Sequence, residues 1–420
     1  MTDIVAELRW RGLIAQSTDA EALSAAMAEG PVTYYCGFDP TAPSLHHGHL
    51  VQLLVLRHLQ AAGHQAIALV GGGTGLIGDP RMSGERTLND AETVAQWAER
   101  LKAQISRFLD FKGENPALLV NNYEWISQLS AIDLLREAGK HFRLGTMLAK
   151  DTVARRLESD EGISYTEFSY QVLQALDFLE LYRRHGCTLQ TGGNDQWGNL
   201  LAGVELIRKE EGEHVHVLTT PLITKSDGTK FGKTEGGAVW LAPDLMSPYA
   251  FYQFWFNTDD ADAGRFLKIF TLLPREEIES LIEESAQRPA ARVAQRALAR
   301  AVTSLVHGAD ACARVEAASS ALFGRGDLTH LDEGTLRDAV AELPSGDLEP
   351  GSSTIVDLLV STGLCRGRSD ARRTVADGGA YLNNEKVTDE DAAITGADLL
   401  AGGVVLVRRG RRNLAVARAK

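Results

Sequence analysis

The sequence predicts an α/β fold in three parts, and three observations support this prediction. Over the first 220 residues, short β-branched or apolar runs alternate with amphipathic stretches, which is the pattern of βα units around a parallel sheet. From about residue 248 to residue 323 the strand signals vanish, and Leu, Ala, Glu and Arg recur with helical spacing. The last 68 residues again combine helical spacing with a closing apolar strand. We therefore expect a parallel-sheet domain, then an α-helical domain, then a small α+β C-terminal domain.

The elements of the first part follow from these runs in chain order. Five strands are expected: Val32 to Phe38, Ala66 to Val70, Ala117 to Asn121, Thr188 to Thr191 and Val215 to Thr219. Five helices are expected between and after them: Leu50 to Ala62, Ala91 to Phe111, Ala131 to His141, Tyr165 to Leu181 and Asp195 to Glu211. This arrangement assigns residues 1–247 to the sheet domain and residues 248–323 to the helical domain.

The C-terminal part begins after a stretch rich in Gly, Asp and Pro. Residues 324–352 have the composition of a linker, so the last domain is expected to span residues 353–420. Helices are predicted over Ser353 to Leu364 and Ser369 to Asp377, and a strand over Val404 to Val407. Apolar spacing through this segment indicates a packed unit rather than a solubilising basic tail.

Length and composition limit the possible classes of protein. A chain of 420 residues usually forms two or three domains, and its 44% hydrophobic and 24% charged residues are ordinary for a globular protein. No apolar run is long enough to span a bilayer, and the N-terminus has no signal-peptide pattern, so a cytoplasmic protein is expected. The four cysteines are scattered without a CxxC pair, which argues against a zinc site and favours reduced thiols.

The charge of the chain is unevenly distributed. The formal net charge is −13, which alone argues against a nucleic-acid ligand. Residues 353–420 nevertheless hold 11 Lys and Arg against 8 Asp and Glu, a net charge of +3, and the remaining residues hold 32 against 48, a net charge of −16. A basic module is therefore attached to an acidic body.

A histidine motif, His46-His47-Gly48-His49, follows the first expected strand and opens a helix. Backbone N–H groups and the helix dipole at such a position favour an anion. His46 and His49 face the same side of the first turn and can donate hydrogen bonds to phosphate oxygens, and Gly48 permits a flat base to approach the backbone. The alternative is a solvated, histidine-rich helix start, which the motif alone does not exclude.

Two further features indicate a small-molecule site. Gly71-Gly72-Gly73 and Asp79 follow the second strand, where glycines permit close approach of a ligand and a carboxylate can receive an ammonium group; a plain tight turn is the alternative. Tyr170, Gln174 and Asp177 are spaced to form one polar stripe on an apolar helix. Solvated stripes are usually rich in Lys and Glu, so this stripe favours a pocket lining.

Near the middle of the chain, Lys230-Phe231-Gly232-Lys233-Thr234 places two lysines on a glycine-containing loop. Gly228 and Gly232 provide the freedom for such a loop to move toward a phosphate ligand. By composition alone, an exposed basic loop is the alternative interpretation.

In this order, the histidine motif and the lysine motif resemble the two signatures of class I aminoacyl-tRNA synthetases. Together with the stripe and the tail, they make the chain similar to the bacterial-type tyrosyl-tRNA synthetases over nearly its full length. The resemblance implies a Rossmann-like catalytic domain and an enzyme of the tyrosine–tRNA ligase class. It also implies two steps: activation of L-tyrosine by ATP to tyrosyl-adenylate with release of pyrophosphate, then transfer of tyrosine to tRNA(Tyr) with release of AMP.

The resemblance also implies roles for individual residues. The family positions that bind tyrosine correspond to Tyr35, Asp79, Tyr170, Gln174, Asp177 and Gln190, with Tyr35 and Asp177 on the phenol. Those that bind ATP correspond to Cys36, Gly37, Asp39, Gly48, Gly193, Asp195, Arg86 and Lys233. The catalytic positions correspond to Thr41, His46, His49, Lys230, Lys233 and Thr234.

The chain departs from the family pattern at two places. His47 stands where the family usually has an apolar residue. After Asp79, where relatives usually carry lysines that help to bind pyrophosphate, the chain reads Arg81-Met82-Ser83-Gly84-Glu85-Arg86. We expect Arg86 to contact pyrophosphate and assign no role to Arg81.

The chemistry fits these residue types. The tyrosine carboxylate is already ionised, so adenylation needs positioning and charge stabilisation rather than a general base. Mg²⁺ is expected on the phosphates of ATP and not in a protein cage, so no protein metal site is expected. The family further implies a homodimer, with no membrane association.

The tail resembles the small αL-motif RNA-binding domain. Its arginines are expected to contact phosphates: Arg366, Arg368, Arg372, Arg373, Arg408, Arg409, Arg411 and Arg412.

Three other classes remain open at this point. A tryptophanyl enzyme shares the fold and the loop but is expected to lack this tail and Tyr35. A small nucleotidylyltransferase also uses the HxGH pattern, but needs neither the helical domain nor the tail. A non-catalytic RNA-binding protein is less consistent with intact Lys230, Lys233 and Asp177.

Overall fold

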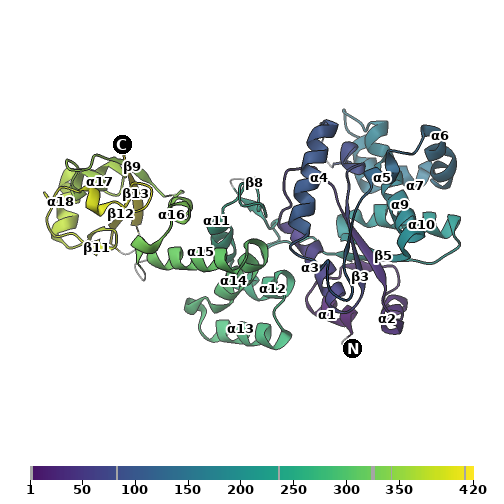
Figure 1. Cartoon of the computed structure of the whole chain (residues 1–420), viewed down its shortest axis with the longest axis horizontal. Coiled ribbons are helices and arrows are strands. Elements are labelled where there is room, and N and C mark those ends of the chain that lie inside the picture. The colour runs from purple at the N-terminus through teal and green to yellow at the C-terminus, as the bar shows by residue number, and fades with distance from the viewer. Residues whose placement is uncertain (1–2, 82–83, 235–236, 323–326, 342, 411–412) are drawn as a thin grey trace. The chain divides into compact units, whose positions relative to one another are not determined.

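The computed structural model of the chain (Figure 1) describes residues 3–81, 84–234, 237–322, 327–341, 343–410 and 413–420. Its contacts divide it into two compact units. The first comprises Met1–Met246 and Phe256–Val302, and the second comprises Ser247–Trp255 and Thr303–Lys420. Among the described residues, no helix combines the length and the apolar character needed to cross a membrane.

The first unit is built on a six-stranded sheet. Its strands are β1 (Gln16–Ser17), β2 (Thr33–Phe38), β3 (Gln65–Val70), β4 (Leu118–Asn121), β5 (Cys187–Gly193) and β6 (His216–Thr220), in the order β1-β6-β5-β2-β3-β4. All pairs are parallel except β1 with β6. The five predicted strands are confirmed, and only the short β1 was missed.

The strand order reverses at β2. The chain moves from β2 outward to β3 and β4, then returns to the other side of β2 with β5 and β6. The carboxyl ends of β2 and β5 therefore flank a topological switch point, which is where open α/β sheets bind ligands. The register pairs Tyr35 of β2 with Gln190 of β5, so these two predicted site residues are direct neighbours.

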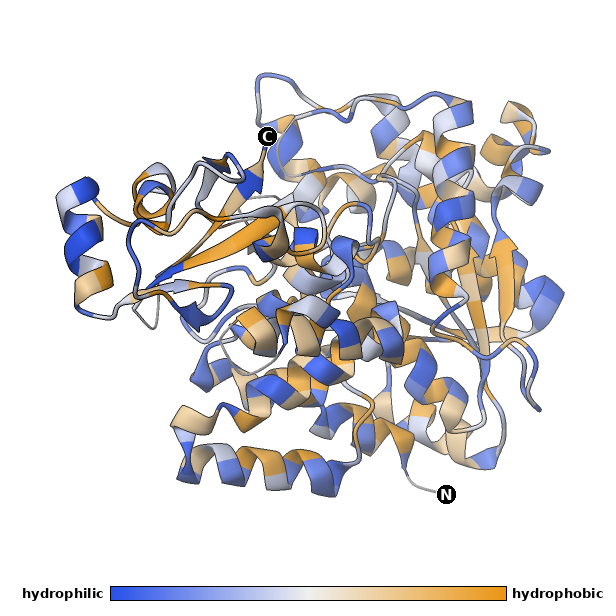
Figure 2. Ribbon diagram, turned by 60° about the vertical axis from the view of Figure 1, so that its left-hand side comes forward, coloured by the Kyte–Doolittle hydropathy of each residue, from blue (hydrophilic) through white to orange (hydrophobic). Residues whose placement is uncertain are grey.

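Helices cover both faces of this sheet. The helices of this part of the chain are α1 (Ile4–Trp10), α2 (Ala20–Glu29), α3 (His47–Ala61), α4 (Ala91–Ile105), α5 (Tyr123–Ile126), α6 (Ala131–Asp133), α7 (Leu144–Leu148), α8 (Asp151–Leu157), α9 (Tyr165–His185) and α10 (Trp197–Glu210). Successive side chains of β2 point to opposite faces of the sheet. On one face the Tyr34 hydroxyl donates to Leu56 O on α3, and on the other Tyr35 packs on Phe178 of α9. Burial on both faces explains why β3 is apolar almost throughout (Figure 2).

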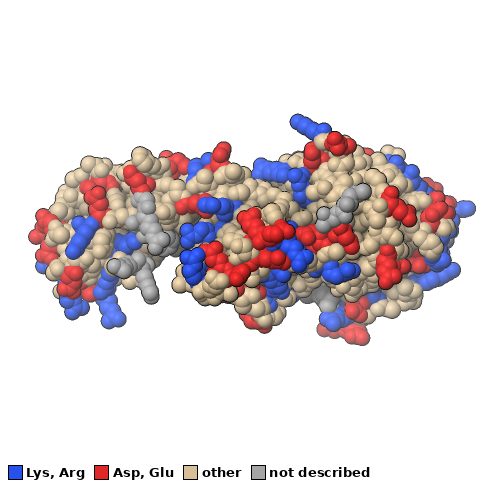
Figure 3. All heavy atoms as spheres, turned by 90° about the horizontal axis from the view of Figure 1, so that it is seen from below, with Lys and Arg blue, Asp and Glu red and all other residues tan. Residues whose placement is uncertain are grey.

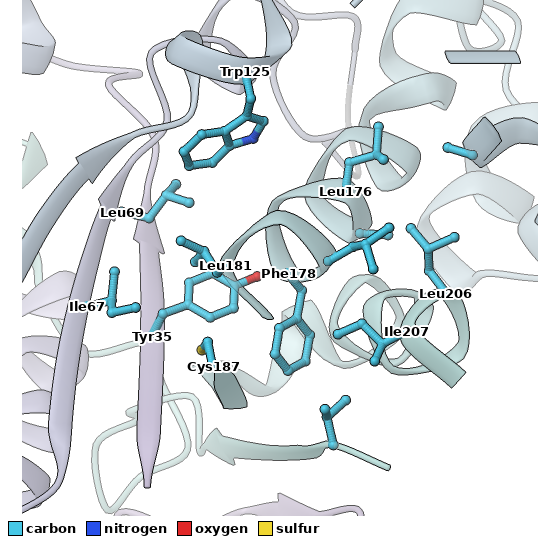
Figure 4. Close-up of a cluster of buried hydrophobic side chains, with 14 residues drawn as sticks. Tyr35, Ile67, Leu69, Trp125, Leu176, Phe178, Leu181, Cys187, Leu206 and Ile207 are labelled. Atoms are coloured by element: carbon cyan, nitrogen blue, oxygen red, sulfur yellow. The ribbon is translucent and has the colours of Figure 1, made fainter. Parts of the chain in front are cut away.

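The core between the sheet and helices α9 and α10 surrounds Tyr35 (Figure 4). Tyr35 points from β2 toward α9, and its ring lies 5.3 Å from that of Phe178. Ile67 and Leu69 of β3 and Trp125 of α5 belong to the same buried cluster. A hydroxyl at this depth can find a partner only from the cavity or from a neighbouring buried group.

Two predicted helices differ from the structure. The stretch Ala131 to His141 forms α6, a π-helical turn Leu134–Ala138 and a 3₁₀ turn Gly139–His141. The prediction relied on an apolar face, but Ile132 and Leu135 are exposed, so no core holds a regular helix there. Helix α4 ends at Ile105 rather than Phe111, because Asp110 turns the chain by accepting the N–H groups of Lys112 and Gly113.

The predicted helical domain is helical, but its helices belong to both units. They are α11 (Pro248–Phe256), α12 (Asp260–Phe270), α13 (Arg275–Gln287), α14 (Val293–His307) and α15 (Ala309–Leu322). Helix α12 packs on the first unit, where Phe266 and Phe270 contact Phe231. Helix α11 packs in the second unit, where Gln253 bonds to Ser319 of α15 at 3.2 Å.

The stretch predicted to be a linker, residues 324–352, is instead largely folded in its described part. It contains a 3₁₀ turn (Leu328–His330), α16 (Glu333–Ala339) and β9 (Ser345–Leu348). Leu336, Val340 and Leu348 are fully buried, so the Gly, Asp and Pro content concealed an apolar pattern.

The C-terminal α+β prediction is confirmed and extended. Helices α17 (Ile355–Ser361) and α18 (Arg368–Ala376) pack on a five-stranded sheet in the order β11-β10-β12-β13-β9. Its remaining strands are β10 (Ala380–Leu382), β11 (Glu385–Lys386), β12 (Val404–Arg409) and β13 (Asn413–Ala419). Thr354 and Asp357 form a capping box that starts α17.

Candidate active site

A cavity of about 890 Å³ opens at the carboxyl ends of β2 and β5. Its lining includes every predicted site residue whose side chain the structure describes: Tyr35, Cys36, Gly37, Asp39, Thr41, His46, Gly48, His49, Asp79, Arg86, Tyr170, Gln174, Asp177, Gln190, Gly193, Asp195 and Lys230. Lys233 and Thr234 form strand β7 (Lys233–Thr234), but their side chains lie outside the described part of the structure. Residues separated by almost 200 positions therefore meet at one place.

The deep end of the cavity carries polar atoms that have no partner in the described structure. The Tyr35 hydroxyl, Gln174 Oε1 and Gln190 Oε1 are buried without a hydrogen bond. An unpaired buried polar group destabilises a fold by about 1–3 kcal/mol. Three of them around one cavity indicate a ligand that presents complementary polar groups.

Asp177 lies beside them and is almost fully buried. Its carboxylate accepts hydrogen bonds from Asn122 Nδ2 at 2.9 Å and from Trp125 Nε1 at 2.8 Å. Burial raises the pKa of Asp177 to about 8, although these two hydrogen bonds act in the opposite direction. The carboxyl group is therefore fixed in orientation, and its charge is sensitive to what occupies the cavity.

Asp39 is held by two hydroxyl groups. Thr74 Oγ1 donates to one carboxylate oxygen and the Tyr170 hydroxyl to the other, both at 2.7 Å. Burial raises the pKa of Asp39 despite these bonds. Asn122 Nδ2 also donates to Thr74 Oγ1, so Asp39 and Asp177 belong to one hydrogen-bonded network.

Asp79 is oriented by the segment after β5. Its carboxylate accepts from Gln196 Nε2 at 2.9 Å and from Asn199 Nδ2 at 3.0 Å, and Lys150 Nζ lies 3.8 Å away. Arg86 Nε donates to the backbone carbonyl of Asp79, which places Arg86 at the cavity rim.

The histidine motif caps α3 with its own imidazoles. His46 Nδ1 accepts from the Gly48 N–H at 3.0 Å, and His49 Nδ1 accepts from the His46 N–H at 3.1 Å. Burial lowers the pKa of both rings, so each is neutral near pH 7 and carries its proton on Nε2. Both histidines can therefore donate to an anion from Nε2, as the motif predicted.

The remaining lining residues permit close approach of a ligand. Thr41 lies in the turn after β2, where its N–H donates to Asp39 O at 2.8 Å. A Cβ at Gly193 would lie 2.4 Å from Asp195 Oδ1, so a side chain there would displace the Asp195 carboxylate. Burial raises the pKa of Cys36 to about 12, so this thiol stays protonated.

The lysine motif forms the outer wall. Lys230 is exposed and lines the cavity, Phe231 is buried, and β7 pairs with β8 (Gly237–Ala238). His47 Nε2 contacts the Phe231 carbonyl at 3.1 Å, so the residue that departs from the family pattern joins the two motifs.

The arginines of the C-terminal unit have two kinds of surroundings. Arg409 bonds to Asp370 and to Leu364 O, and Arg408 bonds to Asn384 and Leu322 O. These two arginines make bonds within the unit, and the expectation that they contact phosphates stays a prediction. Arg411 and Arg412 lie outside the described residues.

Other arginines of this unit are exposed. Arg368, Arg372 and Arg373 are more than half exposed and pair with surface carboxylates at 3.1 to 3.6 Å. Basic and acidic side chains are accordingly interspersed on the face drawn in Figure 3.

Sequence reasoning missed the residues that orient the binding groups: Thr74, Asn122, Trp125, Lys150, Gln196 and Asn199. A signal existed for Asn122, because it directly follows a strand of the parallel sheet, where ligand-site residues collect. Gln196 and Asn199 follow a strand end in the same way. Trp125 and Lys150 have no local signal.

Comparison with known families agrees with this geometry. Residues 27–324 match the family model of class I tRNA synthetases for tryptophan and tyrosine (W and Y), and residues 335–417 match the tyrosine–tRNA ligase SYY-like C-terminal domain. The second match begins inside the stretch predicted to be a linker, which agrees with the folded α16 and β9.

Individual relatives cover the whole chain. It is 62% identical over 417 residues to the tyrosine–tRNA ligase of Streptomyces coelicolor, which covers 99% of this chain and 98% of the relative. It is 61% identical over 421 residues to that of Acidothermus cellulolyticus, covering 99% of each.

A solved structure shares the fold. A C-terminally truncated mitochondrial tyrosyl-tRNA synthetase of Aspergillus nidulans superposes with a TM-score of 0.69 at 33% identity, covering 75% of this chain and 92% of that chain. Family models, full-length relatives and fold point the same way, and they exclude the nucleotidylyltransferase and the non-catalytic RNA-binding protein as classes. The chain belongs to the tyrosine–tRNA ligases, within the class I tRNA synthetases.

Proposed function

We propose that the cavity at the ends of β2 and β5 is where this tyrosine–tRNA ligase binds L-tyrosine and ATP and forms tyrosyl-adenylate. The observation that carries the proposal is the group of three buried, unpartnered polar atoms on Tyr35, Gln174 and Gln190. All three lie at positions that the sequence assigned to tyrosine. A substrate with a phenol hydroxyl and an ammonium group supplies the missing partners.

Tyrosine is recognised at its two polar ends. The Tyr35 hydroxyl and the Asp177 carboxylate pair with the phenol, at the end of the cavity between β2 and α9. Asp79, Tyr170, Gln174 and Gln190 receive the ammonium group. Support for Asp79 comes from Gln196 and Asn199, which fix its two oxygens before substrate arrives.

ATP occupies the outer part of the cavity. Cys36, Gly37, Asp39, Gly48, Gly193 and Asp195 contact the adenosine; Thr41, His46, His49, Arg86, Lys230, Lys233 and Thr234 contact the phosphates. The neutral tautomers of His46 and His49 support this assignment, because each leaves an Nε2–H donor at the start of α3.

The chemistry then follows from position and charge. A tyrosine carboxylate oxygen attacks the α-phosphorus of ATP, the bond from that phosphorus to the bridging oxygen breaks, and pyrophosphate leaves with the electron pair. Cations at the β and γ phosphates stabilise the negative charge that develops there. The terminal ribose hydroxyl of tRNA next attacks the tyrosyl carbonyl carbon, loses its proton and releases AMP.

Mg²⁺, when bound, would be held by the phosphates of ATP. Asp39 is a buried carboxylate in the cavity lining, and both of its oxygens already accept hydrogen bonds, one from Thr74 and one from Tyr170. We therefore assign the ion to phosphate oxygens, where it would reduce the negative charge of the leaving group.

The enzyme acts as a homodimer. Of the thirteen large, exposed apolar side chains among the described residues, nine fall between residues 118 and 165, on and around α5 to α8 and the start of α9. They include Ile132, Leu144 and Tyr165, which are 63%, 65% and 71% exposed. Apolar exposure concentrated in one segment of the chain marks a protein–protein surface.

The C-terminal unit binds tRNA. Its exposed arginines Arg368, Arg372 and Arg373 are held only by surface ion pairs, which contribute little and can be exchanged for RNA phosphates. We place the catalytic part in residues 1–247 and the helical segment in residues 248–323. The RNA-binding part then runs from about α16 to the C-terminus. We place the enzyme in the cytoplasm, with its substrates.

A binding measurement tests the assignment of the cavity. Gln174→Ala removes a group that should bond to the ammonium of tyrosine, so the Kd for L-tyrosine should rise about 10- to 100-fold, as expected for a hydrogen bond to a charged group. Gln96→Ala, an exposed glutamine on α4 outside the cavity, serves as control. An unchanged Kd for Gln174→Ala in isothermal titration would remove the observation on which the proposal depends.

A further inference from the structure

The segment that carries Lys233 and Thr234 is fastened to α3 at both ends by one residue. At its start, His47 Nε2 contacts the Phe231 carbonyl at 3.1 Å. At its end, the His47 backbone N–H donates to the Val239 carbonyl at 2.9 Å. The side chain and the backbone of His47 thus hold two points, Phe231 and Val239, that are eight residues apart in sequence and lie on either side of Lys233 and Thr234.

The side-chain contact has a defined polarity. A carbonyl oxygen only accepts hydrogen bonds, so the imidazole carries its proton on Nε2 and donates it to Phe231 O. Burial lowers the pKa of His47 to about 4, which keeps the ring neutral near pH 7. The other nitrogen, Nδ1, is buried without a hydrogen-bond partner, so the Phe231 contact is the hydrogen bond that orients the ring.

The surrounding residues are shaped around this ring. A Cβ at Gly232 would lie 1.9 Å from the His47 ring, and Gly232 has a φ of 83°, so a side chain there would be excluded twice. The Phe231 ring stands edge-on to the His47 ring at 5.5 Å and packs on Phe266 of α12 at 4.4 Å. A single arrangement of the chain at residues 231 and 232 is therefore selected.

Neighbouring backbone bonds continue the fastening. Leu241 N–H donates to Leu45 O at 2.9 Å, and His46 forms a bridge with Trp240. These backbone bonds hold the C-terminal end of the segment, and they do not depend on the side chain at position 47. At the start of the segment, by contrast, the Phe231 carbonyl bonds to the side chain of His47.

We infer that His47 is a positioning residue for adenylation: its Nε2–H fixes the Phe231 carbonyl and so sets where the lysine motif presents Lys230 and Lys233 to the phosphates of ATP. The inference rests on the proposed role of these lysines and adds a requirement that the family pattern does not contain, because an apolar residue at this position cannot donate a hydrogen bond.

Two substitutions separate the effect of the hydrogen bond that His47 donates from the effect of its side-chain volume. His47→Leu retains an apolar side chain without a donor, whereas the Nε2 of His47→Gln can donate to Phe231 O. The single-turnover rate of tyrosyl-adenylate formation should fall about fivefold to tenfold in His47→Leu and return to within about twofold of the parent in His47→Gln, consistent with one hydrogen bond. The Kd for tyrosine should be unchanged in both, because the tyrosine-binding groups do not contact His47.

A second measurement reports on the segment itself. Cleavage by trypsin after Lys230 should be faster in His47→Leu than in the parent and in His47→Gln. His58→Leu is the matched control, since His58 is a partly buried histidine farther along α3 and does not line the cavity.

The outcomes distinguish this inference from the proposed function. Lys233→Ala is measured in parallel, and its adenylation should be slow. If Lys233→Ala is slow while His47→Leu reacts at the parent rate, the inference is wrong and the proposed role of the lysines stands. Equal slowing in His47→Leu and His47→Gln also overturns the inference, because ring packing rather than donation would then matter. A normal rate for Lys233→Ala would overturn the role of the lysine motif and this inference with it.

Discussion

Tyr35, Gln174 and Gln190 each keep a buried polar atom without a partner at the tyrosine end of the cavity. Such atoms lower stability, and natural folds retain few of them. Their neighbours show the opposite arrangement, because Asp177, Asp39 and Asp79 have their carboxylate oxygens bonded to fixed donors. The cavity therefore combines carboxyl groups that are held rigidly with neutral polar groups that have no partner within the protein.

Asp177 should make stability depend on pH. Its folded-state pKa of about 8 lies above the unfolded value of about 3.9, so the folded chain binds more protons between these values. The contribution of this group to stability is fully present below pH 4 and is lost as pH rises toward 8. Asp177→Asn removes that dependence.

The measurement is urea unfolding of both proteins from pH 5 to pH 9 in the absence of ligands. Relative to the parent, Asp177→Asn should gain stability as pH rises to about 8 and then remain level. The substitution also disturbs the bonds to Asn122 and Trp125, which adds a constant offset but no slope. A difference between the two proteins that does not vary with pH would contradict the raised pKa.

At this scale, the sequence predicted the groups that line the cavity better than the groups that orient them. His46, Gly48 and His49 were predicted because three residues in one turn form a local pattern. Asn122 and Trp125 were missed because their bonds to Asp177 span more than 50 residues of sequence. Asn122 has only the general signal of following a strand, and Trp125 has none.

At the scale of elements, exposed apolar side chains accompany a failed prediction. The stretch Ala131 to His141 was predicted to be one amphipathic helix, but its Ile132 and Leu135 are exposed and a π turn over Leu134–Ala138 interrupts it. A hydrophobic pattern indicates that a helix face will be buried, but not whether the same chain or a second chain covers it. Residues at a subunit interface therefore look like core residues in a single sequence.

The dimer is tested by a charge on this surface. Leu144 is 65% exposed, so Leu144→Asp should fold normally but place an uncompensated charge in the interface, at a cost of roughly 3 kcal/mol or more per copy. In sedimentation velocity the parent should sediment as two copies of the 45.5 kDa chain, and Leu144→Asp should shift toward one.

Leu272→Asp provides the control, because Leu272 is also exposed but lies outside residues 118–165. It should remain a dimer. A parent that sediments as a single copy, or a Leu144→Asp variant that dimerises as tightly as the parent, would contradict the proposed surface.

Strands were easier to predict than connections. All five parallel strands of the first sheet were found from short apolar runs, because burial on both faces leaves a strong signal. Strand β9 was missed, since Ser345–Leu348 is short and polar and pairs with β13 about 70 residues later. Pairing over that distance depends on the folded unit and not on the local composition.

At the scale of the whole molecule, truncation tests the proposal that the first unit forms tyrosyl-adenylate and the second unit binds tRNA. Every residue assigned to tyrosine and ATP lies before residue 239, and the described residues that follow α15 belong entirely to the second unit. Because β9 pairs with β13, the cut must fall before α16. A chain that ends at Leu322 removes the C-terminal sheet as a whole, and the solved relative from Aspergillus nidulans is likewise C-terminally truncated.

Tyrosine-dependent pyrophosphate exchange by this truncated chain should remain within about twofold of the parent. Transfer to tRNA should fall at least tenfold, because the acidic body loses the basic module that attracts the RNA backbone, and the remaining activity should fall steeply with salt. A truncated chain that charges tRNA as well as the parent at physiological salt would show that the second unit is not the RNA-binding module.

The unit boundaries also mark the limit of prediction at this scale. Composition identified a basic C-terminal module, and the comparisons confirmed its family. Composition did not reveal that residues 247–255, which form most of α11, belong to the same unit as this module, whereas residues 256–302 belong to the first unit. Such a crossing of the chain leaves no trace in composition.

The central claim is that the cavity selects tyrosine through its phenol hydroxyl. It is tested most directly by pyrophosphate exchange with L-tyrosine and with L-phenylalanine, for the parent, Tyr35→Phe and Asp177→Asn. Phenylalanine leaves the Tyr35 hydroxyl unpaired and gives the Asp177 carboxylate no phenol to bond, so the parent should strongly prefer tyrosine, and each variant should narrow the ratio of kcat/KM for tyrosine to kcat/KM for phenylalanine at least tenfold. An undiminished preference for tyrosine in both variants would show that the phenol is recognised elsewhere and would contradict the account.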